Sequence, residues 1–157
     1  MSAPLLKNEV LPFGGQLEGR RHRMPVRVYY EDTDAAGIVY HASYLRFTER
    51  GRSEMMRALD IDLARMWNDA GFVFVLHSAE VKYKKPARLG DLLTVETALA
   101  ELGSASLKVR QYITFAKEGG AAGEVVLFEG LLACTGRDGK PARIPAGVRG
   151  KIEAFLS

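Results

Sequence analysis

The sequence predicts an α+β domain in which one long helix packs against an antiparallel sheet of about five strands. Three observations support this fold class. The chain has 157 residues, 47% of them apolar, which suits a single globular domain. One long stretch has helical periodicity, and the segments around it have strand-like patterns joined by short loops. Short connections favour antiparallel pairing, and the helix then covers one face of the sheet.

The first element is predicted to be a tail that covers residues 1–24, with the folded domain spanning residues 25–157. Glycines interrupt the apolar residues of this tail, and its end is basic. A secretory signal has the reverse order, with its charges before an apolar run. No stretch approaches the roughly 18 apolar residues of a membrane span. We therefore expect a cytoplasmic protein without membrane insertion.

A strand is predicted next, over residues 26–31. Val26, Val28 and Tyr30 alternate with more polar neighbours, which is the period of a half-buried strand. The turn-forming residues 32–37 end it.

The clearest helix is predicted over residues 40–59. At 100° per residue its apolar stripe contains Tyr40, Tyr44, Phe47, Gly51 and Met55. A glycine in the middle of this stripe costs about 1 kcal/mol of helix propensity, so it indicates a close approach by another element.

Arg52 projects near the apolar arc of the same helix. Two interpretations stay open at this point. Its charged end either reaches out to water or pairs with a carboxylate.

The rest of the chain is predicted to be mostly strands. A short helix over residues 62–70 closes at Gly71. Of the strand over 72–83, Val75, Ala79, Val81 and Tyr83 are expected on one face. Three further strands and a final short helix are expected over residues 93–99, 107–115, 125–134 and 144–156.

Composition and charge exclude several functions. With 22 Lys and Arg against 19 Asp and Glu, the net charge of +3 does not favour nucleic-acid binding. The single cysteine, Cys134, excludes an intrachain disulfide and a cysteine-based zinc site. No spacing typical of a metal site appears, so we expect neither a metal nor a redox cofactor.

The segment from Asp32 to Gly37 is the most informative for chemistry. Acidic residues before a helix often act only as caps, which is the simplest interpretation of Asp32 and Asp34. A calcium loop does not fit, because Ala36 and Ser43 take positions that need oxygen ligands.

A catalytic interpretation combines Asp34 with the helix that follows. Free N–H groups at a helix start can polarise a carbonyl oxygen. Gly37 allows a close approach, and Asp34 lies on the loop just before these donors. A carboxylate with an ordinary pKa of about 3.9 is a weak base, so a reactive acyl substrate such as a thioester suits it best.

This stretch closely resembles the hot-dog-fold acyl-CoA thioesterases of the 4-hydroxybenzoyl-CoA thioesterase group. Within that group it looks most like the thioesterases associated with the Tol-Pal system. The resemblance extends from about residue 25 to the chain end. It is carried by Val26-Arg27-Val28-Tyr29-Tyr30-Glu31-Asp32-Thr33-Asp34-Ala35-Ala36-Gly37-Ile38-Val39-Tyr40-His41-Ala42-Ser43-Tyr44, by Phe47-x-Glu49-Arg50-x-Arg52-x-Glu54-Met55 and by Val81-x-Tyr83-x-x-Pro86-Ala87-Arg88-Leu89-x-Asp91.

The resemblance implies a hot-dog fold, in which the sheet wraps a long central helix. It implies that Asp34 is the catalytic carboxylate and that the backbone N–H of His41 polarises the thioester carbonyl. The His41 side chain would have an accessory role, although a packed or capping histidine is the alternative. We expect Gly37 and Tyr40 to contact the substrate. The fold also implies a homodimer or homotetramer with the active site at a subunit interface.

Lys84, Lys85 and Arg88 form a basic cluster. It is either a solvated face or a site for the phosphates of coenzyme A or for acyl carrier protein. Two other functions stay open: a module that binds acyl groups or acyl carrier protein with little turnover, and a hot-dog hydratase or dehydratase.

Overall fold

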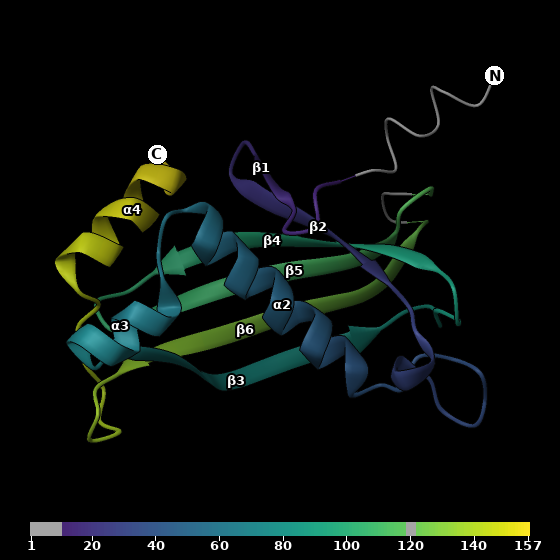
Figure 1. Ribbon diagram of the computed structural model, residues 1–157, viewed down its shortest axis with the longest axis horizontal. Helices are drawn as coiled ribbons and strands as arrows, with labels where there is room; N and C mark the ends of the chain where they lie inside the picture. The colour runs from purple at the N-terminus through teal and green to yellow at the C-terminus, as the bar shows by residue number, and fades with distance from the viewer. Residues whose placement is uncertain (1–10, 119–121) are drawn as a thin grey trace.

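The computed structural model describes residues 11–118 and 122–157, with six strands and three α-helices (Figure 1). A single turn of 3-10 helix, η1 (Tyr30–Asp32), precedes the long helix. The elements, in chain order, are β1 (Gln16–Glu18), β2 (Arg21–Arg27), α2 (Ser43–Ala58), α3 (Leu63–Ala70), β3 (Val73–Tyr83), β4 (Leu92–Leu102), β5 (Ser106–Phe115), β6 (Glu124–Thr135) and α4 (Ala146–Leu156).

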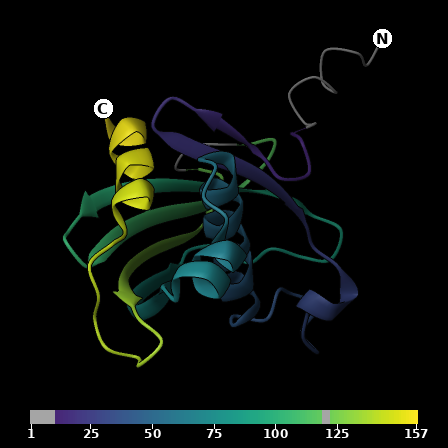
Figure 2. The ribbon, with the colours of Figure 1, turned by 60° about the vertical axis from the view of Figure 1, so that its left-hand side comes forward.

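All the strands form one antiparallel sheet in the order β1-β2-β4-β5-β6-β3. The long helix α2 lies across one face of this sheet, which we call the inner face (Figures 1 and 2). The predicted α+β class and element order are therefore confirmed. The sheet has one strand more than the five expected, because β1 pairs with the start of β2.

The predicted boundary at residue 24 falls inside β2. The side chains of His22, Met24 and Val26 alternate inward along this strand and are buried. Arg21 and Arg23 on either side of His22 concealed the alternation, so residues 16–24 resembled a tail although strands β1 and β2 include most of them. Residues 1–10, the rest of that expected tail, lie outside the described residues.

The strand expected over residues 26–31 lies earlier in the chain than predicted, because β2 begins at Arg21 and ends at Arg27. The buried Asp32 carboxylate accepts the backbone N–H of Tyr29 at 2.8 Å. This bond closes the 3-10 turn and bends the chain out of the sheet before the candidate loop.

Helix α2 buries the predicted stripe against the sheet except for Tyr40, which precedes the helix and is 47% exposed. Tyr44, Phe47 and Met55 are all in the core. A Cβ atom on Gly51 would lie 2.8 Å from the Val95 Cγ1 atom, so the glycine marks the close approach that the sequence indicated. The helix starts at Ser43, three residues later than predicted.

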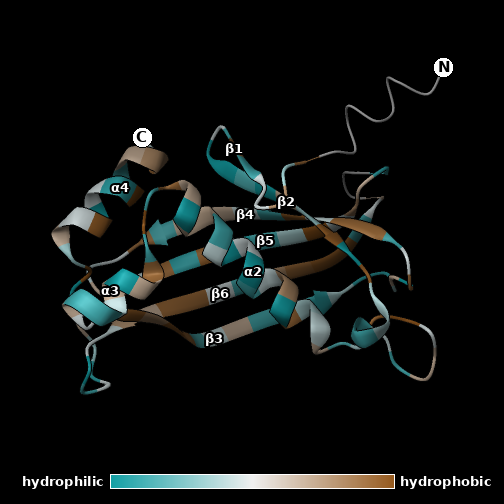
Figure 3. Cartoon of the chain, in the orientation of Figure 1, coloured by the Kyte–Doolittle hydropathy of each residue, from teal (hydrophilic) through white to brown (hydrophobic). Residues whose placement is uncertain are grey.

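The two shorter helices follow their sequence signals. The Asp62 side chain caps α3 by accepting the backbone N–H of Arg65 at 3.0 Å. Gly71 ends the helix in the left-handed conformation. The final helix α4 lies within the predicted residues 144–156. Apolar residues continue along much of β6, as expected for a central strand (Figure 3).

The prediction for the faces of β3 was wrong at Val75. A bulge between Leu76 and Ser78 shifts the register of β3 against β6. As a result Leu76 lies on the inner face, where its side chain approaches Gly130. Val75 lies on the outer face instead, and 41% of its surface is exposed.

Across residues 11–118 and 122–157 no helix combines the length and the apolar character needed to span a membrane.

Candidate active site

Asp34 opens a tight loop that leads to the start of α2. The backbone N–H of Asp34 donates to the Ile38 carbonyl, and that of Gly37 donates to the Asp34 carbonyl, both at 3.0 Å. Gly37 has φ +77°, which favours glycine. The Asp34 Oδ1 atom accepts the Ala36 N–H at 2.9 Å. The side chain is exposed, so its carboxylate is held in place but open to solvent.

The chain returns from this loop directly into the helix start. The backbone N–H of Tyr40 donates to the Asp32 carbonyl at 2.8 Å, and that of Ser43 donates to the Tyr40 carbonyl. Among the residues that the structure describes, no acceptor pairs with the backbone N–H of His41. The His41 amide thus has the free donor that a carbonyl or oxyanion could use.

Aromatic rings surround His41. The centroid of its ring lies 4.5 Å from that of Tyr40 and 6.3 Å from that of Tyr83. The Tyr83 hydroxyl donates to the His41 carbonyl at 3.1 Å. This bond ties the helix start to the end of β3.

A buried tyrosine attaches the segment after β3 to α2. The Tyr44 hydroxyl accepts the backbone N–H of Ala87 at 3.2 Å, and burial raises the pKa of Tyr44, so the ring stays neutral near pH 7. Ala87 in turn accepts the N–H of Val39, and a bridge joins Ile38 to Arg88. Arg88 is therefore placed beside the Asp34 loop.

The three residues of the predicted basic cluster have different surroundings. Lys84 forms an ion pair with Glu124 at 3.0 Å, and the Lys85 amine donates to the Ala122 carbonyl. Within the described ranges the Arg88 guanidinium has no such partner, since the bonds of Arg88 are made by its backbone, with Asp91 and Ile38. Arg88 alone combines a free cationic group with a position next to the Asp34 loop.

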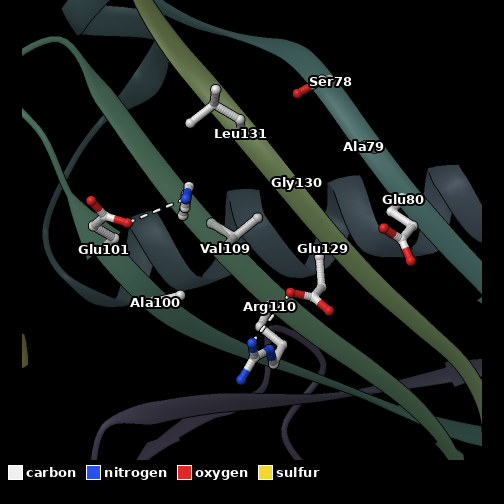
Figure 4. A pocket seen from close by; sticks show the side chains of 11 residues that line it. Ser78, Ala79, Glu80, Ala100, Glu101, Val109, Arg110, Glu129, Gly130 and Leu131 are labelled. Carbon is white, nitrogen blue, oxygen red and sulfur yellow. Dashed lines mark hydrogen bonds and ion pairs between the residues drawn. The ribbon is translucent and has the colours of Figure 1, made fainter.

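Two hollows of the surface are lined by residues other than Asp34 and His41. One of about 560 Å³ lies on the outer face, opposite α2, and is lined by ion-paired side chains such as Arg110 and Glu129 (Figure 4). Another of about 740 Å³ runs between β2 and α2, and is lined by Phe13, Tyr29 and Glu54 among others. Neither contains Asp34 or His41.

No group of three or more His, Cys, Asp or Glu side chains that could hold a metal ion occurs in the described part of the chain.

Sequence reasoning missed one residue of this neighbourhood, Tyr83. It was assigned to a strand face, and its bond to His41 spans 42 positions of the chain. The motif that carried the resemblance contains Tyr83, but no local pattern indicated its partner.

The model of the thioesterase-like superfamily matches residues 28–152 of this chain. The acyl-CoA thioesterase YbgC of Haemophilus influenzae is 45% identical over 87 residues, which cover 55% of this chain and 64% of that relative. The acyl-CoA thioester hydrolase YbgC of Escherichia coli O6:H1 is 44% identical over 95 residues, which cover 60% and 70%. The chain thus aligns with slightly under two thirds of the first relative's length.

Solved structures of thioesterases are also similar to this chain. A probable thioesterase from Bartonella henselae superposes with a TM-score of 0.72 at 34% identity, over 80% of this chain and 99% of that one. The 4-hydroxybenzoyl-CoA thioesterase of Pseudomonas sp. strain CBS-3 superposes at 0.75 with 21% identity, over 84% and 99%, and shows the same fold. The fold is therefore the predicted hot-dog fold, and this chain belongs to the thioesterase-like superfamily.

Proposed function

We propose that this chain hydrolyses acyl-CoA thioesters, with Asp34 as the catalytic carboxylate. The observation that supports this most is the exposed Asp34 carboxylate on a loop that leads straight into a helix start with a free N–H at His41. Relatives that are 44–45% identical are named acyl-CoA thioesterase or thioester hydrolase. The site geometry and these names support the same reaction.

The thioester carbonyl oxygen accepts the N–H of His41, and the helix dipole favours the negative charge that develops there. Asp34 then acts in one of two ways. As a general base it takes a proton from water, which attacks the acyl carbon and displaces the coenzyme A thiolate. As a nucleophile it forms an acyl anhydride, which water hydrolyses after the thiolate has left. In both routes the proton that the attacking water loses is passed to the coenzyme A thiolate, and the His41 imidazole orients the water or the carboxylate.

Gly37 and Tyr40 are proposed to contact the substrate near the reacting carbon, because both lie between Asp34 and the helix. Arg88 is proposed to bind a phosphate of coenzyme A, since its guanidinium is unpaired in the described residues and lies beside the loop. Lys84 and Lys85 are proposed as weaker contributors, because Glu124 and Ala122 already engage them. The same cationic groups would suit acyl carrier protein as an alternative donor.

A second copy of the chain is proposed to complete the site, in a homodimer or homotetramer. Strand β3 lies at one edge of the sheet, and 44% of the surface of Leu76 and 49% of that of Tyr83 are exposed on its inner face. An exposed edge strand with apolar side chains favours pairing with another chain. The resemblance further supports a cytoplasmic location and association with the Tol-Pal system.

The test is the Asp34→Asn variant, assayed by thiol release from a panel of short, long and aromatic acyl-CoA esters. We expect turnover to fall by about 10²–10⁴-fold, because the amide neither takes a proton nor attacks the acyl carbon. Asp69→Asn, on the exposed side of α3, is the matched control and should retain wild-type turnover. Unchanged turnover in Asp34→Asn would refute the assignment. Binding of the esters without hydrolysis by the wild type would indicate a binding module, and hydration of enoyl esters would indicate a hydratase.

A further inference from the structure

Arg52 is a charged residue on the buried side of α2 that lacks an acidic partner. Its guanidinium donates to the Gln111 side-chain oxygen at 3.1 Å and lies 5.2 Å from the centre of the Phe128 ring. Among the described residues no carboxylate lies within 4.0 Å of it. Of the two interpretations open from the sequence, the carboxylate pair is thus wrong.

The surroundings of Arg52 make its positive charge less favourable than it is in water. Burial lowers the pKa of Arg52, and the charge of Glu49 opposes that shift. Glu49 lies one turn earlier on the helix, but its carboxylate accepts the Ser53 hydroxyl at 2.8 Å. The guanidinium has five N–H donors, and one of them has an acceptor in the described residues. A partly buried guanidinium whose N–H donors mostly lack acceptors favours the binding of an anion.

Arg52 faces the part of the inner face that α2 leaves open. Leu45, Glu49, Arg52 and Met56 lie on one side of the helix by their spacing. That side faces β6 and β3, because Arg52 lies over Phe128 and Met56 packs in the same core cluster as Phe128. Leu45, Leu76 and Tyr83, which we call the open strip, expose large parts of their side chains there. Tyr83 connects this strip to His41.

We propose that Arg52 is a specificity-determining residue that binds a carboxylate at the far end of the acyl group. This inference rests on the proposed function, in which the thioester carbonyl lies at His41. Arg52 follows His41 by eleven residues, and the nine residues from Ser43 to Arg52 span about 14 Å along the helix axis at 1.5 Å per residue. Its side chain leans back toward the helix start, which shortens this span. An acyl group of medium length that lies along the open strip brings its end to the guanidinium.

The experiment compares suberoyl-CoA with octanoyl-CoA, which differ in the carboxylate or methyl group at the end of the acyl chain. Thiol release gives the ratio of the two kcat/KM values for each variant of the full chain. In Arg52→Met we expect this ratio to fall by about tenfold or more, chiefly through suberoyl-CoA, because a charged hydrogen bond is lost. Arg52→Lys keeps the charge and should restore part of the preference.

Arg57→Met is the matched control, since Arg57 is an exposed arginine of the same helix whose guanidinium pairs with Glu54. It should leave the ratio unchanged. An equal fall of both kcat/KM values in Arg52→Met would mean that Arg52 only supports the fold, and thermal unfolding of each variant measures that contribution. An unchanged ratio would likewise overturn the proposal.

The role of Arg52 can also be tested if the protein does not hydrolyse acyl-CoA esters. If the wild type releases thiol from neither ester, the Kd values of the two esters are measured by titration calorimetry. A preference for suberoyl-CoA that disappears in Arg52→Met then supports the role of Arg52 without hydrolysis. Equal Kd values in the wild type would overturn it.

Discussion

Helix α2 and the residues 40–42 that lead into it differ in their contact with the sheet, and we call them the buried half and the exposed half of this region. In the buried half Gly51 allows the helix backbone to approach Val95 and Thr97, and the buried amide of Gln111 fills the contact. The Gln111 Nε2 atom donates to the Thr48 carbonyl and to the Thr97 hydroxyl, both at 2.9 Å. In the exposed half Tyr40 and His41, which precede the first helical residue Ser43, are open to solvent.

This difference predicts that substitutions in the two halves affect different properties of the protein. In the buried half the Gln111 amide satisfies the Thr48 carbonyl and the Thr97 hydroxyl inside the protein, so changes at this contact should lower the free energy of unfolding. The exposed half presents groups to a substrate, so changes there should alter turnover and leave the fold intact.

The largest effect on stability is expected from Gln111→Leu in the buried half. The leucine leaves the Thr48 carbonyl, the Thr97 hydroxyl and the Arg52 guanidinium without their shared partner. Buried groups that lose their partner cost about 1–3 kcal/mol each to leave unsatisfied, so we expect a loss of about 3 kcal/mol. Urea unfolding monitored by circular dichroism measures it. Gln16→Leu on the exposed strand β1 is the control, and an equal loss there would contradict the division.

Two glycine-to-alanine variants should change stability by smaller amounts and in opposite directions. Gly51→Ala places a Cβ atom 2.8 Å from the buried Val95 side chain, and the overpacking should exceed the helix propensity gained. We expect a net loss of about 1 kcal/mol. Gly150→Ala in α4 meets no atom within 4 Å and should stabilise the protein by about 0.5–1 kcal/mol.

Equal signs for the two glycine variants in the same urea titration would mean that the close approach at Gly51 does not govern its stability.

The buried half was also the easier part to predict from the sequence. The stripe of Tyr44, Phe47, Gly51 and Met55 repeats at the helical period, and the cost of a glycine there indicated a close contact. Local periodicity did not show the bulge that turned Val75 outward, because the bulge depends on the pairing of β3 with β6. Nor did it show the start of β2, where arginines alternate with buried His22 and Met24.

For the candidate site, the sequence placed Asp34 near His41 because only six residues separate them. The residues that contact His41 and Ile38 come from distant segments of the chain, so these contacts depend on the fold. Tyr83 reaches His41 from the end of β3, and Arg88 reaches Ile38 from the loop after it. Gln111, which accepts a hydrogen bond from Arg52, lies on strand β5 and 59 positions away in the sequence.

His22 gives a pH-dependent test of the N-terminal end of the sheet. Burial lowers its pKa, while a bond to the Gly14 carbonyl and the charge of Glu54 partly offset this shift. Between the lowered pKa and the ordinary value of about 6.5, the unfolded chain binds more protons than the folded chain. Stability should therefore fall as the pH drops from 7.5 to 5.5, with the unfolding temperature as the measurement. In His22→Gln this part of the pH dependence should disappear, and an identical profile would contradict the assignment to His22.

The smallest effect is expected from Tyr83→Phe in the exposed half of the comparison. The variant keeps the ring beside His41 and Tyr44 but removes the hydroxyl that donates to the His41 carbonyl. An exposed hydrogen bond contributes about 0.5–1 kcal/mol, so kcat/KM for an acyl-CoA ester should fall two- to fivefold. The unfolding temperature should stay unchanged, because the bond lies at the surface. Tyr30→Phe, whose ring is exposed, is the control and should leave both quantities unchanged. If Tyr83→Phe lowered the unfolding temperature and left kcat/KM intact, the residues that lead into α2 would be part of the scaffold, and the division between the two halves would fail.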